Sequence, residues 1–149
     1  MKKRFTIIPF LLAILITMIT ASCEVEFVNN GKLDGYWRLM KVDTLATKGS
    51  LDLSKKLIFW GVEAHLLEVV NRDTIFDDYL MHFDYENDKL TLGEPYQYKQ
   101  QTIDYPVTDA KVLNPFGINK INEEFDVEKI SGSNMTLRSE TLRLWFNKY

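Results

Sequence analysis

Three short segments near the end of the chain alternate apolar and polar residues, with turn-forming residues between them. They are residues 124–128 (EFDVE), 135–137 (MTL) and 142–147 (LRLWFN). Successive side chains of a β-strand point to opposite faces, so a period of two puts one set of residues on a buried face and the other in solvent. Residues 131–134 (SGSN) and the pair Ser139 and Glu140 supply the turns. The pattern predicts a three-stranded antiparallel meander.

Most of the chain before this meander has the same character. The segments are rich in β-branched and aromatic residues, and turn residues separate them. Strands are predicted at residues 36–43, 56–60, 64–70, 79–86 and 89–92. Residues 44–54 are predicted as a loop, residues 61–63 as a hairpin turn, and Asn87 with Asp88 as a two-residue hairpin connection. With the meander, these segments predict an all-β antiparallel domain of about eight strands.

The alternation also predicts which side chains face the interior. On the strand at 79–86 the inner set is Tyr79, Met81, Phe83 and Tyr85. The first strand breaks the pattern, because Lys41 falls on the same phase as Trp37, and a β-bulge after Met40 would restore it. The aromatic residues predicted to face inward are Trp37, Phe59, Phe83, Phe125 and Phe146.

Residues 94–122 have no sustained period of two. The first half is rich in Tyr and Gln, with Tyr96, Tyr98 and Tyr105, and residues 108–113 predict a short helix that stops before Pro115 and Gly117. Aromatic side chains with a polar end are typical of protein and sugar contact surfaces when they lie on a loop. The alternative is that these tyrosines simply cover the domain.

The N-terminal 22 residues have the three parts of a secretory signal. Lys2, Lys3 and Arg4 form a basic start, residues 5–19 are an apolar run, and small residues 21 and 22 follow. A membrane-spanning helix needs about 20 apolar residues, so this run favours a cleaved signal over a retained helix. The only cysteine of the chain, Cys23, comes directly after it.

This arrangement resembles a bacterial lipoprotein signal, with Thr20 at a position where Leu is usual. The resemblance implies that Cys23 is acylated and becomes the mature N-terminus, with residues 23–32 as a short tether and residues 33–149 as the domain. It implies export and a lipid anchor in the bacterial cell envelope, at the periplasmic or outer surface of the outer membrane. The alternative is an ordinary signal peptide followed by a free cysteine.

Gly35-x-Trp37 at the start of the first strand resembles the first-strand signature of lipocalins. The whole domain, including the closing segments 135–137 and 142–146, resembles the lipocalin-like lipoproteins of the calycin group. The resemblance implies a small up-and-down barrel with one short helix or capping loop. It also implies that Trp37 plugs one end, with an arginine, Arg143 or Arg138, lying over its indole ring. The alternative is that both arginines are simply solvated, because they fall on the phase opposite the apolar residues.

The sequence offers no catalytic constellation. It has no phosphate-binding loop, no nucleophile elbow and no zinc-protease motif, and the pair His82 and Asp84 is best explained as solvated. We therefore expect no enzyme activity, no metal and no cofactor. The formal net charge of −3 makes nucleic acid a poor partner.

Two functions remain. The first is a carrier of a small apolar ligand, which the lipocalin resemblance implies and which would use inward residues such as Phe59 and Phe83. The second is a filled barrel that serves as a structural or adhesion subunit. It would bind an envelope protein or a glycan through Tyr96, Tyr98 and Tyr105.

Overall fold

The computed structural model of the chain describes residues 28–74, 78–98 and 105–149. The predicted signal segment, the predicted acylation site Cys23 and residues 24–27 of the tether lie outside the described residues. In the part that is described, no helix has the length and apolar character needed to cross a membrane.

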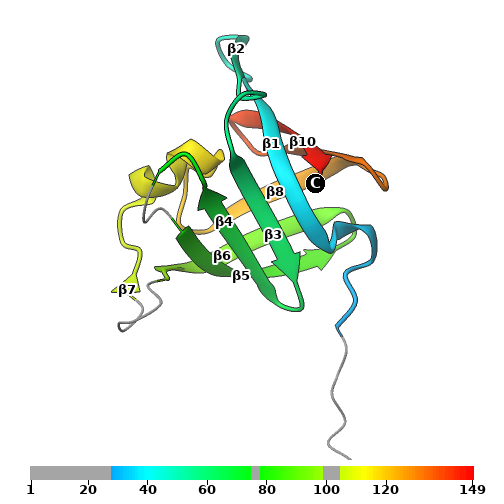
Figure 1. Cartoon of the computed structure of the whole chain (residues 1–149), viewed down its shortest axis with the longest axis vertical. Coiled ribbons are helices and arrows are strands. Elements are labelled where there is room, and N and C mark those ends of the chain that lie inside the picture. Colours follow the sequence, from blue (N-terminus) through cyan, green and yellow to red (C-terminus); the bar gives the residue numbers. More distant parts are fainter. Residues whose placement is uncertain (1–27, 75–77, 99–104) are drawn as a thin grey trace, which may run out of the picture.

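Eight antiparallel strands form a closed barrel (Figure 1). They are β1 (Gly35–Thr44), β3 (Ile58–Glu63), β4 (Leu66–Asn71), β5 (Asp78–Glu86), β6 (Lys89–Gln97), β8 (Glu123–Ile130), β9 (Asn134–Arg138) and β10 (Leu142–Lys148). Each strand pairs with the next in this series, and β10 pairs with β1 to close the barrel. The predicted all-β, up-and-down barrel of about eight strands is confirmed, as is the terminal meander of β8, β9 and β10.

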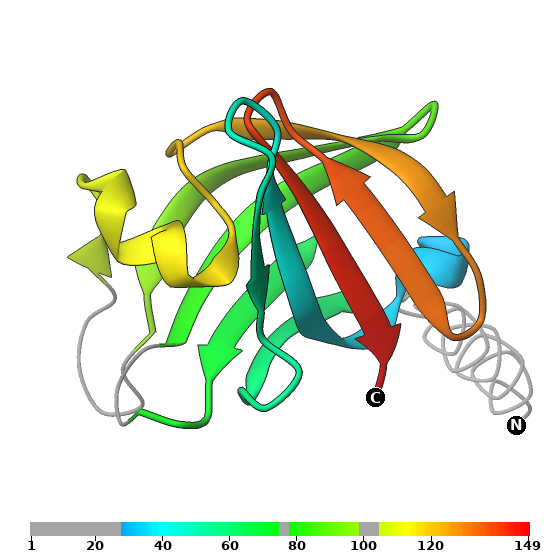
Figure 2. The same ribbon diagram turned by 90° about the horizontal axis from the view of Figure 1, so that it is seen from above.

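Two 3-10 helices lie at opposite ends of this barrel (Figure 2). The helix η1 (Gly31–Leu33) leads into β1, and the helix η2 (Ala110–Phe116) follows the short strand β7 (Tyr105–Pro106), which pairs with β6. We call these the η1 end and the η2 end. The side chain of Asp109 caps η2 by accepting a hydrogen bond from the Lys111 backbone N–H at 3.0 Å. The predicted short helix is therefore present as a 3-10 helix, but it runs through Pro115 instead of stopping before it.

Local pairing corrects three of the predicted boundaries. Residues 61–63 continue β3, and the chain turns at Ala64, whose φ is +52°. Strand β6 extends past Gly93 to Gln97, because its second half pairs with β5 and β7. The segment predicted as a loop at 44–54 contains β2 (Gly49–Asp52), which forms a hairpin with β1.

The predicted bulge in β1 is present. Leu39 pairs with Phe146 of β10, whereas Lys41 pairs with Trp145, so the register shifts by one residue at Met40. The shift returns Lys41 to the outer surface, where its ammonium lies 4.4 Å from the centre of the Trp145 ring. The bulge therefore keeps a charged side chain out of the barrel.

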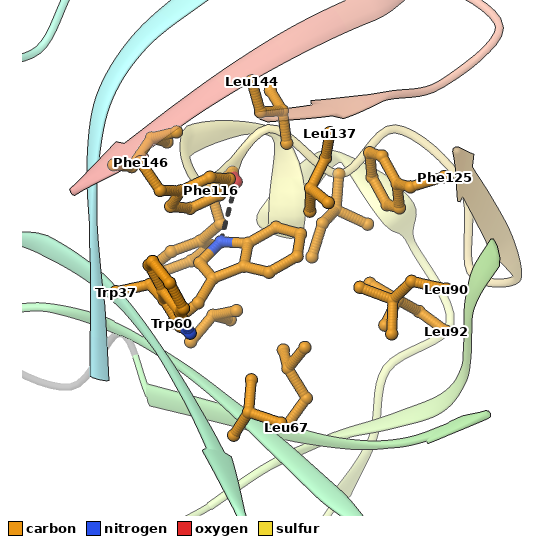
Figure 3. Close-up of a cluster of buried hydrophobic side chains, with 14 of the residues drawn as sticks. Trp37, Trp60, Leu67, Leu90, Leu92, Phe116, Phe125, Leu137, Leu144 and Phe146 are labelled. Atoms are coloured by element: carbon orange, nitrogen blue, oxygen red, sulfur yellow. Dashed lines mark hydrogen bonds between the residues drawn. The ribbon is translucent and has the colours of Figure 1, made fainter. Parts of the chain in front are cut away.

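The barrel interior is a single apolar cluster (Figure 3). Its largest members are aromatic and at most 2% exposed: Trp37, Trp60, Phe116, Phe125 and Phe146. The predicted inner face of β5 is confirmed, since Tyr79, Met81 and Phe83 all belong to this cluster.

The prediction for β3 is wrong by one residue. Trp60 points into the barrel and donates a hydrogen bond from Nε1 to the Phe116 carbonyl oxygen at 3.1 Å. Phe59 lies on the outer face, where it stacks on Tyr36 at a centroid distance of 5.0 Å and meets the edge of Tyr149 at 5.2 Å. Phe59 is only 4% exposed, because these two tyrosines cover it.

Candidate functional site

Trp37 occupies the η1 end of the barrel interior, and its side chain is fully buried. Its Nε1 donates a hydrogen bond to the carbonyl oxygen of Leu33, the last residue of η1, at 2.8 Å. This bond joins the helix that precedes β1 to the core and satisfies the one polar atom of the indole. Trp37 therefore ties η1 to the barrel.

The cation over Trp37 is Lys148, not Arg143 or Arg138 as predicted. The Lys148 Nζ lies 4.8 Å from the indole ring and donates a hydrogen bond to the Asp34 carbonyl oxygen at 2.7 Å. Lys148 reaches this place because it is the register partner of Trp37 across the β1–β10 closure.

The two arginines face outward, on the surface formed by β8, β9 and β10. Arg143 makes a bidentate ion pair with Glu128, with N–O distances of 2.7 and 2.8 Å. Arg138 is exposed and lines a polar hollow of about 500 Å³ together with Glu124 and Asp126. Both residues therefore contribute to the outer surface, at a distance from the plug residue Trp37.

The three predicted contact tyrosines lie around the η2 end. Tyr96 is on β6, opposite Pro106 of β7, and is half-buried. Tyr98 and Tyr105 are 41% and 56% exposed. Beside Tyr105 there is a hollow of about 200 Å³, which Val112 of η2 also lines. The structure therefore brings exposed tyrosines and an exposed apolar side chain together at one end of the barrel.

A larger groove, of about 870 Å³, runs along the outer wall of β1, β3, β4 and β5. It is lined mainly by apolar and small residues, and Tyr36, Gly61, Leu66 and Leu80 are among them. This site was not predicted, because Gly61 falls in the segment predicted as a hairpin turn. A glycine inside a strand often marks a place where another group approaches the backbone closely, and that signal would have pointed here.

The two histidines line one hollow of about 430 Å³ with Asp84 and Glu94. His82 and Asp84 are both exposed, as expected for a solvated pair. Within residues 28–74, 78–98 and 105–149, no group of three or more His, Cys, Asp or Glu side chains is placed to hold a metal ion.

Comparison with known proteins agrees with this architecture. The sequence model of a family described as a lipocalin-like domain matches residues 16–149. Curated proteins give no match.

Two solved structures from Bacteroides species share the fold. A lipocalin-like protein from Bacteroides uniformis is 20% identical in sequence, and the match covers 80% of this chain and all of that one, with a TM-score of 0.61. An uncharacterized protein from Bacteroides eggerthii is 18% identical over 78% of this chain and 98% of that one, with a TM-score of 0.53. At these identities the likeness concerns the fold alone.

Proposed function

The chain belongs to the lipocalin-like domain family, and on that premise we propose that it is a lipid-anchored lipoprotein of the bacterial cell envelope. In this proposal the barrel is a filled scaffold, and the exposed tyrosines at the η2 end bind a protein or glycan of the envelope. The observation that carries the proposal is the difference in exposure between the aromatic side chains inside the barrel and those at the η2 end. The large rings inside are buried, whereas Tyr98 and Tyr105 are exposed.

The anchor rests on the signal-like residues 1–22 and on the position of Cys23 directly after them. Residues 24–27 are all that separate Cys23 from the first described residue, Val28, and five residue steps span at most about 17 Å. Two or three acyl chains on Cys23 would hold the protein stably, whereas one chain would be marginal. The domain would then lie close to the membrane surface.

We expect the Cys23→Ser variant to lose labelling by radioactive palmitate and to keep the mass of the uncleaved precursor. The matched control is Thr20→Leu, which restores the residue that is usual before a lipoprotein cysteine and should keep both labelling and processing. If Cys23→Ser is labelled and processed like the natural chain, the lipoprotein assignment is wrong.

The contact surface can be tested with a double variant, Tyr98→Ser with Tyr105→Ser. Exposed aromatic side chains add apolar contact area while keeping a hydroxyl for hydrogen bonding, so their loss should weaken partner binding at least tenfold. The matched control is Leu51→Ser on the β2 hairpin, since Leu51 is 58% exposed and lies outside this surface. Binding of the purified protein to isolated cell-wall glycan and to outer-membrane proteins is the measurement. Unchanged binding by the double variant would rule out this surface.

A small apolar ligand inside the barrel is the second candidate, and the family supports it. Such a ligand would have to displace rings that now contact one another, such as Trp60 and Phe146 with centroids 5.1 Å apart. Titration with a fatty acid while the tryptophan fluorescence is followed distinguishes the two functions. A saturable one-to-one complex that shifts the tryptophan emission would favour the carrier and contradict the filled scaffold.

A further inference from the structure

The outer wall of the barrel holds a row of side chains that crosses four strands. Tyr36 of β1 pairs with Gly61 of β3, Gly61 pairs with Glu68 of β4, and Glu68 pairs with Leu80 of β5. Paired residues on neighbouring strands point to the same face, so all four lie on the outer surface. All four line the groove of about 870 Å³.

Gly61 opens the groove at the middle of this row. A Cβ atom at this position would lie 3.0 Å from Cε2 of Tyr36 and 3.7 Å from Oε2 of Glu68. Even a methyl group would therefore press against the Tyr36 ring, so glycine is what lets this ring pack closely on β3 beside the carboxylate. With glycine there, the backbone of β3 forms the floor, and Leu66 and Leu80 supply apolar walls.

The charged residues that line the groove are acidic, and one cation, Arg72, lies beside them in a side-chain hydrogen bond with Tyr36. The described lining of the groove includes Asp34, Glu63 and Glu68 and contains no Lys or Arg. The Asp34 carboxylate already has hydrogen-bond partners within the chain. It accepts hydrogen bonds from the backbone N–H and the side-chain amide of Asn30 at 2.9 and 2.6 Å. Glu63 is exposed at the rim.

Glu68 is the half-buried carboxylate of the groove. Among the described residues no ion pair within 4.0 Å and no hydrogen bond reaches its side chain. Burial raises the pKa of Glu68, the charge of Asp78 raises it further, and Arg72 partly offsets this effect. A cation placed against Glu68 would therefore gain a charge-assisted hydrogen bond to a carboxylate that lacks a close partner.

We propose that this groove binds an organic cation with an apolar body, which places its ammonium group against the Glu68 carboxylate at the edge of the Tyr36 ring. The apolar part of the ligand packs against Tyr36, Leu66 and Leu80. Anionic ligands of the same shape are rejected, because they would meet Glu68 and Glu63 with the same charge. The site lies on the outer wall and does not depend on the acylation of Cys23 or on the tyrosines of the η2 end.

The test uses three small ligands that share a phenyl group and differ in charge. They are phenethylammonium, the neutral phenethyl alcohol, and the anionic 3-phenylpropionate. Each is titrated into the full chain in lipid nanodiscs, with empty nanodiscs as the blank, and heat release is measured. We expect saturable binding of the ammonium compound, at least tenfold tighter than the alcohol, and no measurable binding of the carboxylate.

Glu68→Gln should remove the preference for the cation over the alcohol while leaving the shape of the groove unchanged. The matched control is Glu86→Gln, at the exposed end of β5, which should keep that preference. As a second measurement, the amide NMR signal of Gly61 should shift with the cation and not with the carboxylate. Equal affinities for the three ligands, a preference that survives in Glu68→Gln, or a Gly61 signal that does not move would each overturn the proposal.

Discussion

Trp37 shows how one side chain organises an end of the barrel. Its indole is completely buried, its N–H is bonded to Leu33, and Lys148 lies over its ring. We expect Trp37→Ala to lower the free energy of unfolding by about 3–5 kcal/mol, because it leaves a large cavity and an unpaired carbonyl. Chemical denaturation followed by circular dichroism measures this change.

Two further substitutions serve as controls for that experiment. Trp145→Ala removes a tryptophan that is 37% exposed, and Lys148→Met removes the charge over the ring together with the exposed hydrogen bond to the Asp34 carbonyl oxygen, so each should cost less than about 1.5 kcal/mol. A loss below about 1 kcal/mol for Trp37→Ala would show that the indole does not hold the η1 end together.

Glu68 gives a prediction about pH. Burial raises its pKa in the folded protein above the ordinary value of 4.5, so the ionised carboxylate opposes folding. That cost is fully present above the folded pKa and disappears as the pH falls below the unfolded value. Glu68→Gln should therefore raise the free energy of unfolding near pH 7, by less than about 1 kcal/mol because solvent screens a half-buried group. Near pH 3.5 the variant and the natural chain should be equally stable; a larger difference at the lower pH would contradict the assignment.

At the level of elements, the β1 bulge determines which side chains of the first strand enter the barrel. Deleting Met40 removes the extra residue and makes Lys41 follow Leu39 directly, so strict alternation still places Lys41 on the outer face and we expect a cooperative thermal transition. Deleting Val42 instead moves Asp43 into the inward position opposite Leu144. An unpaired carboxylate in the core is costly, so we expect the Val42 deletion to prevent cooperative folding. A Val42 deletion that melts like the natural chain would show that the register of β1 does not decide which side chains enter the barrel.

The elements also show which parts of the fold were predictable. Apolar and polar residues alternate along strands β5, β8 and β10, so the sequence predicts which side chains of these strands face inward. Strand β3 does not, because Ile58, Phe59 and Trp60 are all apolar and a period of two cannot choose between the phases. The choice comes from Tyr36 and Tyr149, which cover Phe59 from the outside. Such distant contacts are set by barrel closure and are invisible to a local pattern.

The same reason explains the incomplete prediction of the candidate sites. The sequence pointed to a cation over Trp37, but only the β1–β10 register identifies it as Lys148. Gly61 has the local character of a turn residue, and pairing with β1 and β4 overrides it. The exposed tyrosines of the η2 end were found because aromatic residues without strand periodicity stand out in an otherwise alternating chain.

At the scale of the whole molecule, the closed barrel separates two surfaces. The described chain begins at the η1 end, and β7 and η2 lie at the other end (Figure 2). Because the stretch from Cys23 to Val28 spans at most about 17 Å, acylation of Cys23 would bring the η1 end to the membrane. The tyrosines of the η2 end would then face away from the bilayer, where a partner can reach them.

This orientation can be measured on vesicles that carry a fluorescence quencher on their lipid headgroups. A fluorophore is attached through a cysteine introduced either at Lys32 on η1 or at Thr108 near η2, both of which are exposed. Acylation leaves Cys23 without a thiol, so each protein carries one label. We expect at least twofold stronger quenching of the label at 32 than of the label at 108, because quenching falls steeply with distance from the membrane. Equal quenching at the two positions would mean that the barrel lies on its side. It would contradict the prediction that the η2 end faces away from the membrane toward partners.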